Sequence, residues 1–349
     1  MSNYPRSGLQ TSRIINPKHF VLVLVGPTAT GKTPISLRIA DKLDTEIISA
    51  DSRQIYKLMD IGTAKPSIED RRKVKHYFVD ELFPDEEFNA GEFGKKGRDV
   101  VDDILQRKKI PLVVGGSGLY VQALIDGFFD GPSADKDIRE QLYQRLAEGG
   151  GEKLLDELRA IDAEAASTML PTNTRRIIRA LVVYRVTGIP ISQLRKFKTK
   201  INFIPILAGL NWDRKILYER INRRVDLMIE HGLVDEVKRL RDHGYTSTLN
   251  AFQTVGYKEV FDFIDGKIDY QRMIDLIKQN SRRYAKRQLT WFRQDERIRW
   301  FDLYDGEDFG KIALEISKYY FTSVGAGGFE PPTSWSRTKR SSRAEPRPE

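Results

Sequence analysis

The segment GPTATGKT at residues 26–33 has the spacing G-x-x-x-x-G-K-[ST] of a phosphate-binding loop. In such a loop, glycines let the backbone wrap around an anion, and successive N–H groups point at its oxygens. Lys32 would supply a positive charge, and Thr33 would supply a hydroxyl ligand for Mg²⁺. The sequence therefore predicts a phosphate or diphosphate site, without identifying the molecule that carries the phosphate. The residues of this site are Gly26, Pro27, Thr28, Ala29, Thr30, Gly31, Lys32 and Thr33.

A second cluster begins at Asp51, which closes the apolar segment EIISAD at 46–51. If that segment is a strand of a parallel sheet, Asp51 lies at the sheet edge where such folds bind ligands. Its carboxylate could then bind Mg²⁺, cap the next helix or act as a general base. A third segment, GGSGLY at 115–120, follows another apolar run but contains no acidic residue. This absence argues against an ordinary ATPase, because only Asp51 resembles the acid that holds Mg²⁺ in that class.

Positive charge is concentrated near the C-terminal end of the chain. Residues 278–299 contain eight Lys and Arg but only two acidic residues, Asp295 and Glu296. Tyr284, Trp291 and Phe292 are interleaved with the basic residues. Basic side chains that alternate with aromatic rings are typical of a nucleic-acid surface, although an exposed basic helix without a ligand has a similar composition.

The elements that would position these residues alternate between strands and helices. Short apolar runs at 20–25, 46–51, 110–116 and 203–210 predict strands, and helical spacing predicts helices at 34–43, 91–108 and 175–187. This alternation predicts an α/β fold with a P-loop-type parallel sheet and flanking helices. A mostly helical insertion, with two helices around Gly149–Gly151, and a helical C-terminal part complete the expected fold.

We expect four segments along the chain. They are the first part of the P-loop core at 18–130, the helical insertion at 131–171, the rest of the core with the C-terminal helices at 172–320, and a disordered tail at 322–349. The tail is expected to be disordered because it is rich in Gly, Pro, Ser and Arg and has no hydrophobic period.

Composition excludes several classes of site. The chain has 349 residues, a net charge of +9 and no cysteine, so disulfides, thiolate nucleophiles and Cys-based zinc sites are impossible. Its four histidines are too scattered to predict a metal site. The longest apolar run near the N-terminus is too short to span a membrane, and we expect a cytoplasmic protein without a membrane partner.

Eight motifs in one order resemble the tRNA dimethylallyltransferase family, also called tRNA isopentenyltransferases. The resemblance covers about residues 18–320 and is specific because the motifs occur jointly. They are GPTATGKT at 26–33, SADSRQIY at 49–56, DIGTAKP at 60–66, GGSGLY at 115–120, SADKDIR at 133–139, NTRRIIRAL at 173–181, TVGYKE at 254–259 and YAKRQLTWFR at 284–293.

The resemblance implies a reaction and its catalytic residues. A dimethylallyl group would pass from dimethylallyl diphosphate to N6 of adenine 37, in tRNAs that read codons beginning with U, with Mg²⁺ as cofactor. Asp51 would be the base for the N6 proton, and Lys32 and Arg224 would bind the diphosphate. The partners would be the donor and a tRNA anticodon stem-loop, and we expect a monomer.

The resemblance also implies a set of tRNA contacts. They are Asp51, Ser52, Arg53, Gln54, Ser117, Arg139, Arg175, Arg176, Ile177, Ile178, Arg179, Gln253, Thr254, Val255, Gly256, Tyr257, Lys258, Lys286, Arg287, Gln288, Leu289, Thr290, Trp291, Phe292 and Arg293.

Two other functions fit part of the sequence. A P-loop kinase for a small metabolite or nucleotide would use Lys32, Thr33 and Asp51 but would leave the basic aromatic segment without a role. An RNA-binding NTPase would use both the loop and the basic charge, and it would bind nucleotide as strongly as prenyl diphosphate.

Overall fold

The structure is a computed structural model in which residues 19–128, 135–197, 199–306 and 308–325 are described. These residues form two compact units. The first unit comprises the described residues within Met1–Glu87, Asp99–Gly118 and Asn202–Glu349, and the second comprises Phe88–Arg98 and Leu119–Ile201. Residues 135–171 of the predicted insertion lie in the second unit.

The first unit is built around a six-stranded parallel sheet, with the strand order β3-β2-β4-β1-β5-β6. Its strands are β1 (Phe20–Val25), β2 (Glu46–Ser49), β3 (His76–Tyr77), β4 (Pro111–Gly115), β5 (Ile204–Trp212) and β6 (Arg299–Leu303). The predicted α/β fold with a parallel sheet and flanking helices is confirmed.

The predicted apolar runs occupy the interior of the sheet. All six residues of β1 are buried, since this strand is paired on both sides and covered on both faces. By contrast, β6 is an edge strand with alternating exposed and buried residues, and no continuous apolar run predicts it. The two-residue strand β3 was also missed, because it is too short to show a period.

Seven helices in the described part of the first unit flank the sheet or extend from it. They are α1 (Lys32–Leu43), α2 (Ile68–Lys73), α9 (Arg214–Glu230), α10 (Leu233–Asp242), α11 (Tyr257–Ile264), α12 (Tyr270–Phe292) and α13 (Phe309–Gly325), with a 3₁₀ turn, η1 (Asn250–Phe252), before α11. Helix α3 (Ala90–Gln106) is shared between the two units.

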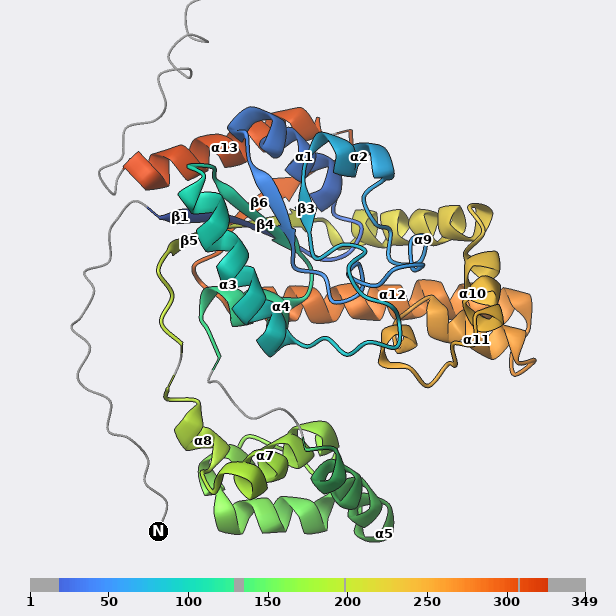
Figure 1. The fold of residues 1–349 in the computed structure, drawn as a ribbon. Coiled ribbons are helices and arrows are strands. Elements are labelled where there is room, and N and C mark those ends of the chain that lie inside the picture. The colour runs from blue at the N-terminus through green and yellow to red at the C-terminus, as the bar shows by residue number, and fades with distance from the viewer. Residues whose placement is uncertain (1–18, 129–134, 198, 307, 326–349) are drawn as a thin grey trace, which may run out of the picture. The chain divides into compact units, whose positions relative to one another are not determined.

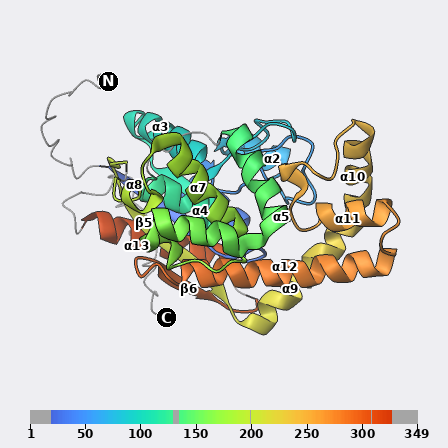
Figure 2. The same cartoon turned by 90° about the horizontal axis from the view of Figure 1, so that it is seen from below.

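Two pairs of helices support the site described below. Helices α1 and α13 pack against each other over one face of the sheet (Figure 1), and their apolar residues share a core with β1 and β5. The long helix α12 lies beside α9, as both views show, and its N-terminal end packs against α11 (Figures 1 and 2). Asp269 caps α12 by accepting a hydrogen bond from the backbone N–H of Arg272 at 2.7 Å.

The second unit has a helical core of its own. Besides the first part of α3, it contains α4 (Gly118–Ile125), α5 (Lys136–Ile161), α6 (Ala163–Ala166), α7 (Thr174–Thr187) and α8 (Ile191–Leu194). Helix α5 is broken at Gly150, whose φ of 74° is left-handed, so the two helices predicted around 149–151 are confirmed. Leu142, Leu155 and Ile177 are among the fully buried residues of this core.

Two further expectations concern membrane-spanning helices and the C-terminal tail. Among the described residues, no helix is both long enough and apolar enough to span a membrane. The predicted disordered tail at 322–349 begins inside α13, which continues to Gly325, so its first four residues are helical. The remainder of that tail lies outside the described residues.

The amino end of β2 carries a charge network that predicts a pH dependence of stability. Hydrogen bonds from Arg107 and Tyr77 lower the pKa of Glu46 to about 2. The folded state therefore gains stability above the ordinary pKa of 4.5 and loses it as the pH falls toward 2. We expect Glu46→Gln to lower the free energy of unfolding at pH 7 by on the order of 2 kcal/mol, and the difference from wild type to shrink below pH 4.

Guanidinium titrations at several pH values would measure this difference. Glu140→Gln, at an exposed position of α5, is the matched control and should change stability little. A deficit in Glu46→Gln that does not vary with pH would contradict this interpretation.

Candidate functional site

The strand order brings three loops to one edge of the sheet. Strand β1 lies next to β4, and β4 lies next to β2, with all three parallel. The residues that follow them are the phosphate loop at 26–33, the segment beginning at Asp51 and the glycine segment at 115–118. These are the three segments that the sequence singled out, and they meet at the carboxyl edge, where parallel sheets bind ligands.

The second and third loops are joined by hydrogen bonds. The backbone N–H of Ser117 donates to the carbonyl of Ala50 at 3.2 Å, and the hydroxyl of Ser117 accepts from the N–H of Ser52 at 3.1 Å. A Cβ at Gly115 would lie only 2.1 Å from the carbonyl oxygen of Ala50. The glycine is therefore required by the close approach of the two chain segments.

Four backbone carbonyls of the phosphate loop accept hydrogen bonds from side chains. Lys32 donates to the carbonyls of Gly26 (2.9 Å) and Pro27 (2.7 Å). The Trp212 indole N–H donates to the Thr30 carbonyl at 3.1 Å, and Arg220 Nε donates to the Ala29 carbonyl at 3.0 Å. Carbonyls fixed in this way leave the loop's N–H groups to face an anion.

Two cations of the site, Lys32 and Arg224, are half-buried. Neither Lys32 nor Arg224 forms an ion pair with any residue in the described part of the chain. Burial, and then the charge of Arg224, lower the pKa of Lys32 to about 7, while Asp51 partly opposes the shift. Burial also lowers the pKa of Arg224. An anion would offset the cost of desolvating these charges, so the pair is a candidate anion site.

Asp51 lies beside this anion site. Its Oδ1 accepts a hydrogen bond from the N–H of Arg53 at 2.9 Å, and its charge acts on Lys32, Arg224 and Tyr284. The chain after Asp51 forms turns, so Asp51 stabilises a turn and the helix-cap alternative is wrong. Its roles as a base or a metal ligand remain predictions.

The oxygen ligands available for a metal are few. No group of three or more His, Cys, Asp or Glu that could hold a metal ion occurs among the described residues. Thr33, at the end of the phosphate loop, and Asp51 carry hard oxygen atoms of the type that Mg²⁺ prefers. This set fits Mg²⁺, which is commonly held by one or two protein oxygens together with substrate phosphates.

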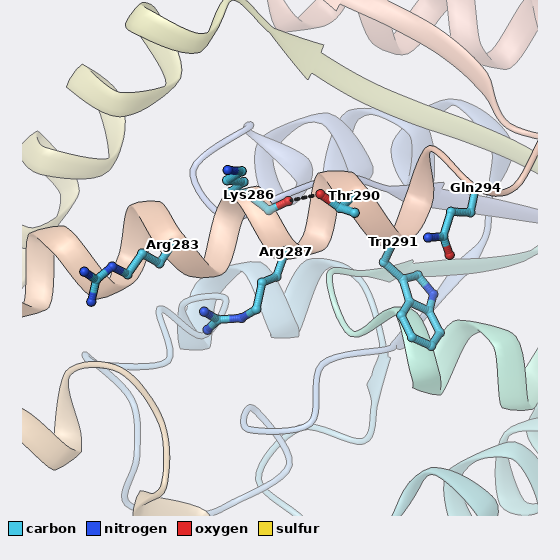
Figure 3. A pocket seen from close by; sticks show the side chains of 6 residues that line it. All are labelled: Arg283, Lys286, Arg287, Thr290, Trp291 and Gln294. Carbon is cyan, nitrogen blue, oxygen red and sulfur yellow. Dashed lines mark hydrogen bonds between the residues drawn. The ribbon is translucent and has the colours of Figure 1, made fainter. Parts of the chain in front are cut away.

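Helix α12 presents a basic groove to the surface. The groove has a volume of about 430 Å³ and is lined by Arg283, Lys286, Arg287, Thr290, Trp291 and Gln294 (Figure 3). Arg283, Arg287 and Trp291 project from one side of the helix, and the Trp291 side chain is 43% exposed. Three cations beside an exposed indole ring match the predicted nucleic-acid surface.

The neighbouring face of α12 contacts the site loops. Gln288 is buried and hydrogen bonds to Thr28 and Gly116. A Cβ at Gly118 would lie 2.2 Å from Cδ1 of Trp291. The same helix therefore borders both the basic groove and the phosphate loop.

Glu236, which belongs to none of the predicted motifs, organises the DIGTAKP segment at 60–66. Its buried carboxylate accepts hydrogen bonds from the N–H groups of Asp60 (2.9 Å), Ile61 (2.8 Å) and Gly62 (3.2 Å), and from the Tyr257 hydroxyl (2.6 Å). No sequence pattern distinguishes this glutamate from the exposed acids of the same helix.

Several residues predicted to contact tRNA have buried side chains in this structure. Gln288 and Phe292 are buried on α12, Tyr257 is buried on α11, and Ile177 and Ile178 belong to the core of the second unit. They are unavailable as surface contacts because each is packed inside its own unit. The exposed members of the predicted set are Arg139, Arg175, Arg176, Gln253, Lys258, Lys286, Arg287, Thr290, Trp291 and Arg293, and half-buried members include Asp51–Gln54, Ser117, Arg179, Thr254, Val255 and Leu289.

The chain resembles proteins of known function. A family model described as IPP transferase matches residues 54–295. The tRNA dimethylallyltransferase of Thermotoga maritima is 46% identical over 300 residues, which are 85% of this chain and 97% of the relative. That of Geobacillus thermodenitrificans is 46% identical over 302 residues, covering 86% and 95%.

Two solved structures share the fold. The full-length tRNA isopentenylpyrophosphate transferase of Bacillus halodurans is 39% identical with a TM-score of 0.66, and the match covers 93% of this chain and all of that one. A eukaryotic dimethylallyltransferase described as acting on tRNA is 26% identical with a TM-score of 0.75, and the match covers 87% and 80%.

The Tyr257–Glu236 hydrogen bond predicts a measurable effect on stability. Tyr257→Phe removes one of four donors to a buried carboxylate, so we expect the free energy of unfolding to fall by about 1–3 kcal/mol. Urea titration would measure the change. Tyr270→Phe, at an exposed position, is the matched control and should be nearly neutral; equal stability of the two variants would contradict the assigned role.

Proposed function

The chain belongs to the IPP transferase family and is a tRNA-modifying prenyltransferase, and we propose that it transfers a dimethylallyl group from dimethylallyl diphosphate to N6 of adenine 37. The acceptors are tRNAs that read codons beginning with U, and the products are N6-(dimethylallyl)adenosine and diphosphate. We place the reaction in the cytoplasm.

The anion site beside Asp51 is the observation that carries this proposal. Lys32 and Arg224 lack an ion-pair partner in the described structure, and the phosphate loop adds N–H donors. This group of donors fits the diphosphate of the donor molecule. A carboxylate at the same edge is placed to receive a proton from the acceptor.

The chemistry assigns one task to each group. The lone pair of N6 attacks C1 of the dimethylallyl group, the N6–C1 bond forms, and the C1–O bond breaks with its electron pair leaving on the diphosphate. Lys32 and Arg224 stabilise the negative charge that develops on the departing oxygens. Asp51 accepts the N6 proton. The phosphate loop therefore holds a leaving group and does not donate phosphate.

Mg²⁺ is the cofactor that we propose, with Thr33 as its protein ligand. When bound, it would neutralise negative charge on the departing diphosphate. Because Asp51 is proposed to accept the N6 proton, its carboxylate is not assigned as a ligand of the metal.

The tRNA anticodon stem-loop is the proposed macromolecular partner. Arg283, Lys286 and Arg287 on α12 would bind backbone phosphates, and the exposed ring of Trp291 would stack on a base. In the second unit, Arg175 and Arg176 are exposed at the N-terminal end of α7 and are further candidates for phosphate contacts.

A transfer assay tests the function. The purified protein is incubated with Mg²⁺, labelled dimethylallyl diphosphate and an anticodon stem-loop that contains adenine 37, and labelled ATP replaces the donor in a parallel reaction. Label should enter RNA from the prenyl donor alone. ATP consumption without prenyl transfer would favour the kinase or NTPase alternative.

Asp51→Asn tests the proposed base. The amide keeps an oxygen for the Arg53 N–H but cannot accept the N6 proton, so kcat should fall at least a hundredfold. Steady-state kinetics and an RNA filter-binding assay would separate catalysis from affinity, which should change much less. Asp41→Asn, on the exposed side of α1, is the control; a kcat near wild type in Asp51→Asn would reject the assignment.

Lys286→Ala tests the basic groove. Loss of one phosphate contact should weaken RNA binding and reduce the slope of log K against log salt by about 1. Titrations between low and moderate salt would measure both quantities, with Lys42→Ala on α1 as the control. An unchanged slope would place the RNA on another surface.

A further inference from the structure

Gln288 connects helix α12 with the phosphate loop through both ends of its amide group. Its Oε1 accepts a hydrogen bond from the backbone N–H of Thr28 at 2.9 Å, and its Nε2 donates to the carbonyl of Gly116 at 2.8 Å. The side chain is only 7% exposed. An uncharged amide suits this position because it offers one acceptor and two donors.

The contact is close on the side of the glycine segment. A Cβ at Gly116 would lie 2.3 Å from Nε2 of Gln288, so a larger residue there would displace the amide. Gln288 thus holds together two loops that follow different strands, β1 and β4. Since Thr28 is already bonded to Gln288, the N–H groups later in the loop remain for the diphosphate.

Other groups fix the phosphate loop from elsewhere in the first unit. Trp212 at the end of β5 binds the Thr30 carbonyl, and Arg220 on α9 binds the Ala29 carbonyl. Gln288 adds an anchor from α12 at the beginning of the loop. These anchors hold the loop in a shape that presents its N–H groups before the donor binds. The entropic cost of ordering the loop on binding is therefore reduced.

We propose that Gln288 is a positioning residue for the donor diphosphate and not a contact to RNA. It acts through Thr28 and Gly116, on the side of α12 that faces the loops, whereas Lys286 and Arg287 have exposed side chains. The inference rests on the proposed function, because it assigns the phosphate loop to dimethylallyl diphosphate.

Gln288→Ala and Gln288→Glu test this assignment. The alanine variant leaves the Thr28 N–H and the Gly116 carbonyl without their partner, so the KM and Kd for dimethylallyl diphosphate should rise about tenfold. The glutamate variant keeps an acceptor for Thr28 but loses the donor to Gly116 and adds negative charge near the diphosphate, so its loss should be larger. The Kd for the anticodon stem-loop, measured without donor, should stay within twofold of wild type in both variants.

Gln271→Ala is the matched control, since Gln271 is an exposed glutamine on the same helix. Circular dichroism and thermal unfolding identify folded variants, and the nearly isosteric Gln288→Glu provides the test if the alanine variant does not fold. A purely structural role would lower the active fraction and the apparent kcat while leaving the donor KM unchanged.

The possible results separate the two hypotheses. Weaker RNA binding with unchanged donor KM and Kd would overturn the proposal and make Gln288 an RNA contact. Wild-type donor affinity in the folded glutamate variant would also overturn it. Binding of dimethylallyl diphosphate to the wild-type protein is measured first. Failure of the wild-type protein to bind it would contradict the proposed function, and not the assignment of Gln288.

Discussion

A loop whose N–H groups face an anion needs other hydrogen-bond donors for its carbonyl groups. Several elements of the first unit supply these donors. The carbonyls of residues 26, 27, 29 and 30 accept hydrogen bonds from Lys32, Arg220 and Trp212. These donors come from α1, α9 and the end of β5. The sheet sets the start of the loop, and the surrounding helices set its shape. The shape of the proposed anion site therefore depends on the assembled unit, although the motif that predicts it has eight residues.

Two faces of helix α12 have different surroundings. One face buries Gln288 against the site loops, and another presents Arg283, Lys286 and Arg287 to solvent. A single rigid helix thus fixes the distance between the anion site and the basic groove. Because the acceptor base must reach the donor carbon, such a fixed distance is a direct requirement of transfer between a small molecule and a macromolecule.

Sequence patterns predict the features that short segments of the chain define by themselves. The strands β1, β2, β4 and β5 coincide with the apolar segments that predicted them, and Lys32 lies in a motif whose spacing is specific. The edge strand β6 was missed because its alternation is short and partly charged. Glu236 and Gln288 resemble the exposed polar residues of their helices, and only their tertiary partners reveal their burial. Ile177 and Ile178 were assigned to RNA with their neighbours, although their apolar side chains already indicated a core.

The order of the strands also constrains how the chain acquires its structure during synthesis. Strand β1 is one of the first described elements, yet its partner β5 begins at Ile204, and β5 in turn pairs with β6 at Arg299. The middle of the sheet therefore stays incomplete until most of the chain has left the ribosome. Pairings between such distant segments carry a high loop-closure cost and form slowly. During that interval the apolar segment at 20–25 lacks its pairing with β5, so we expect the nascent chain to be most prone to aggregation before β5 emerges.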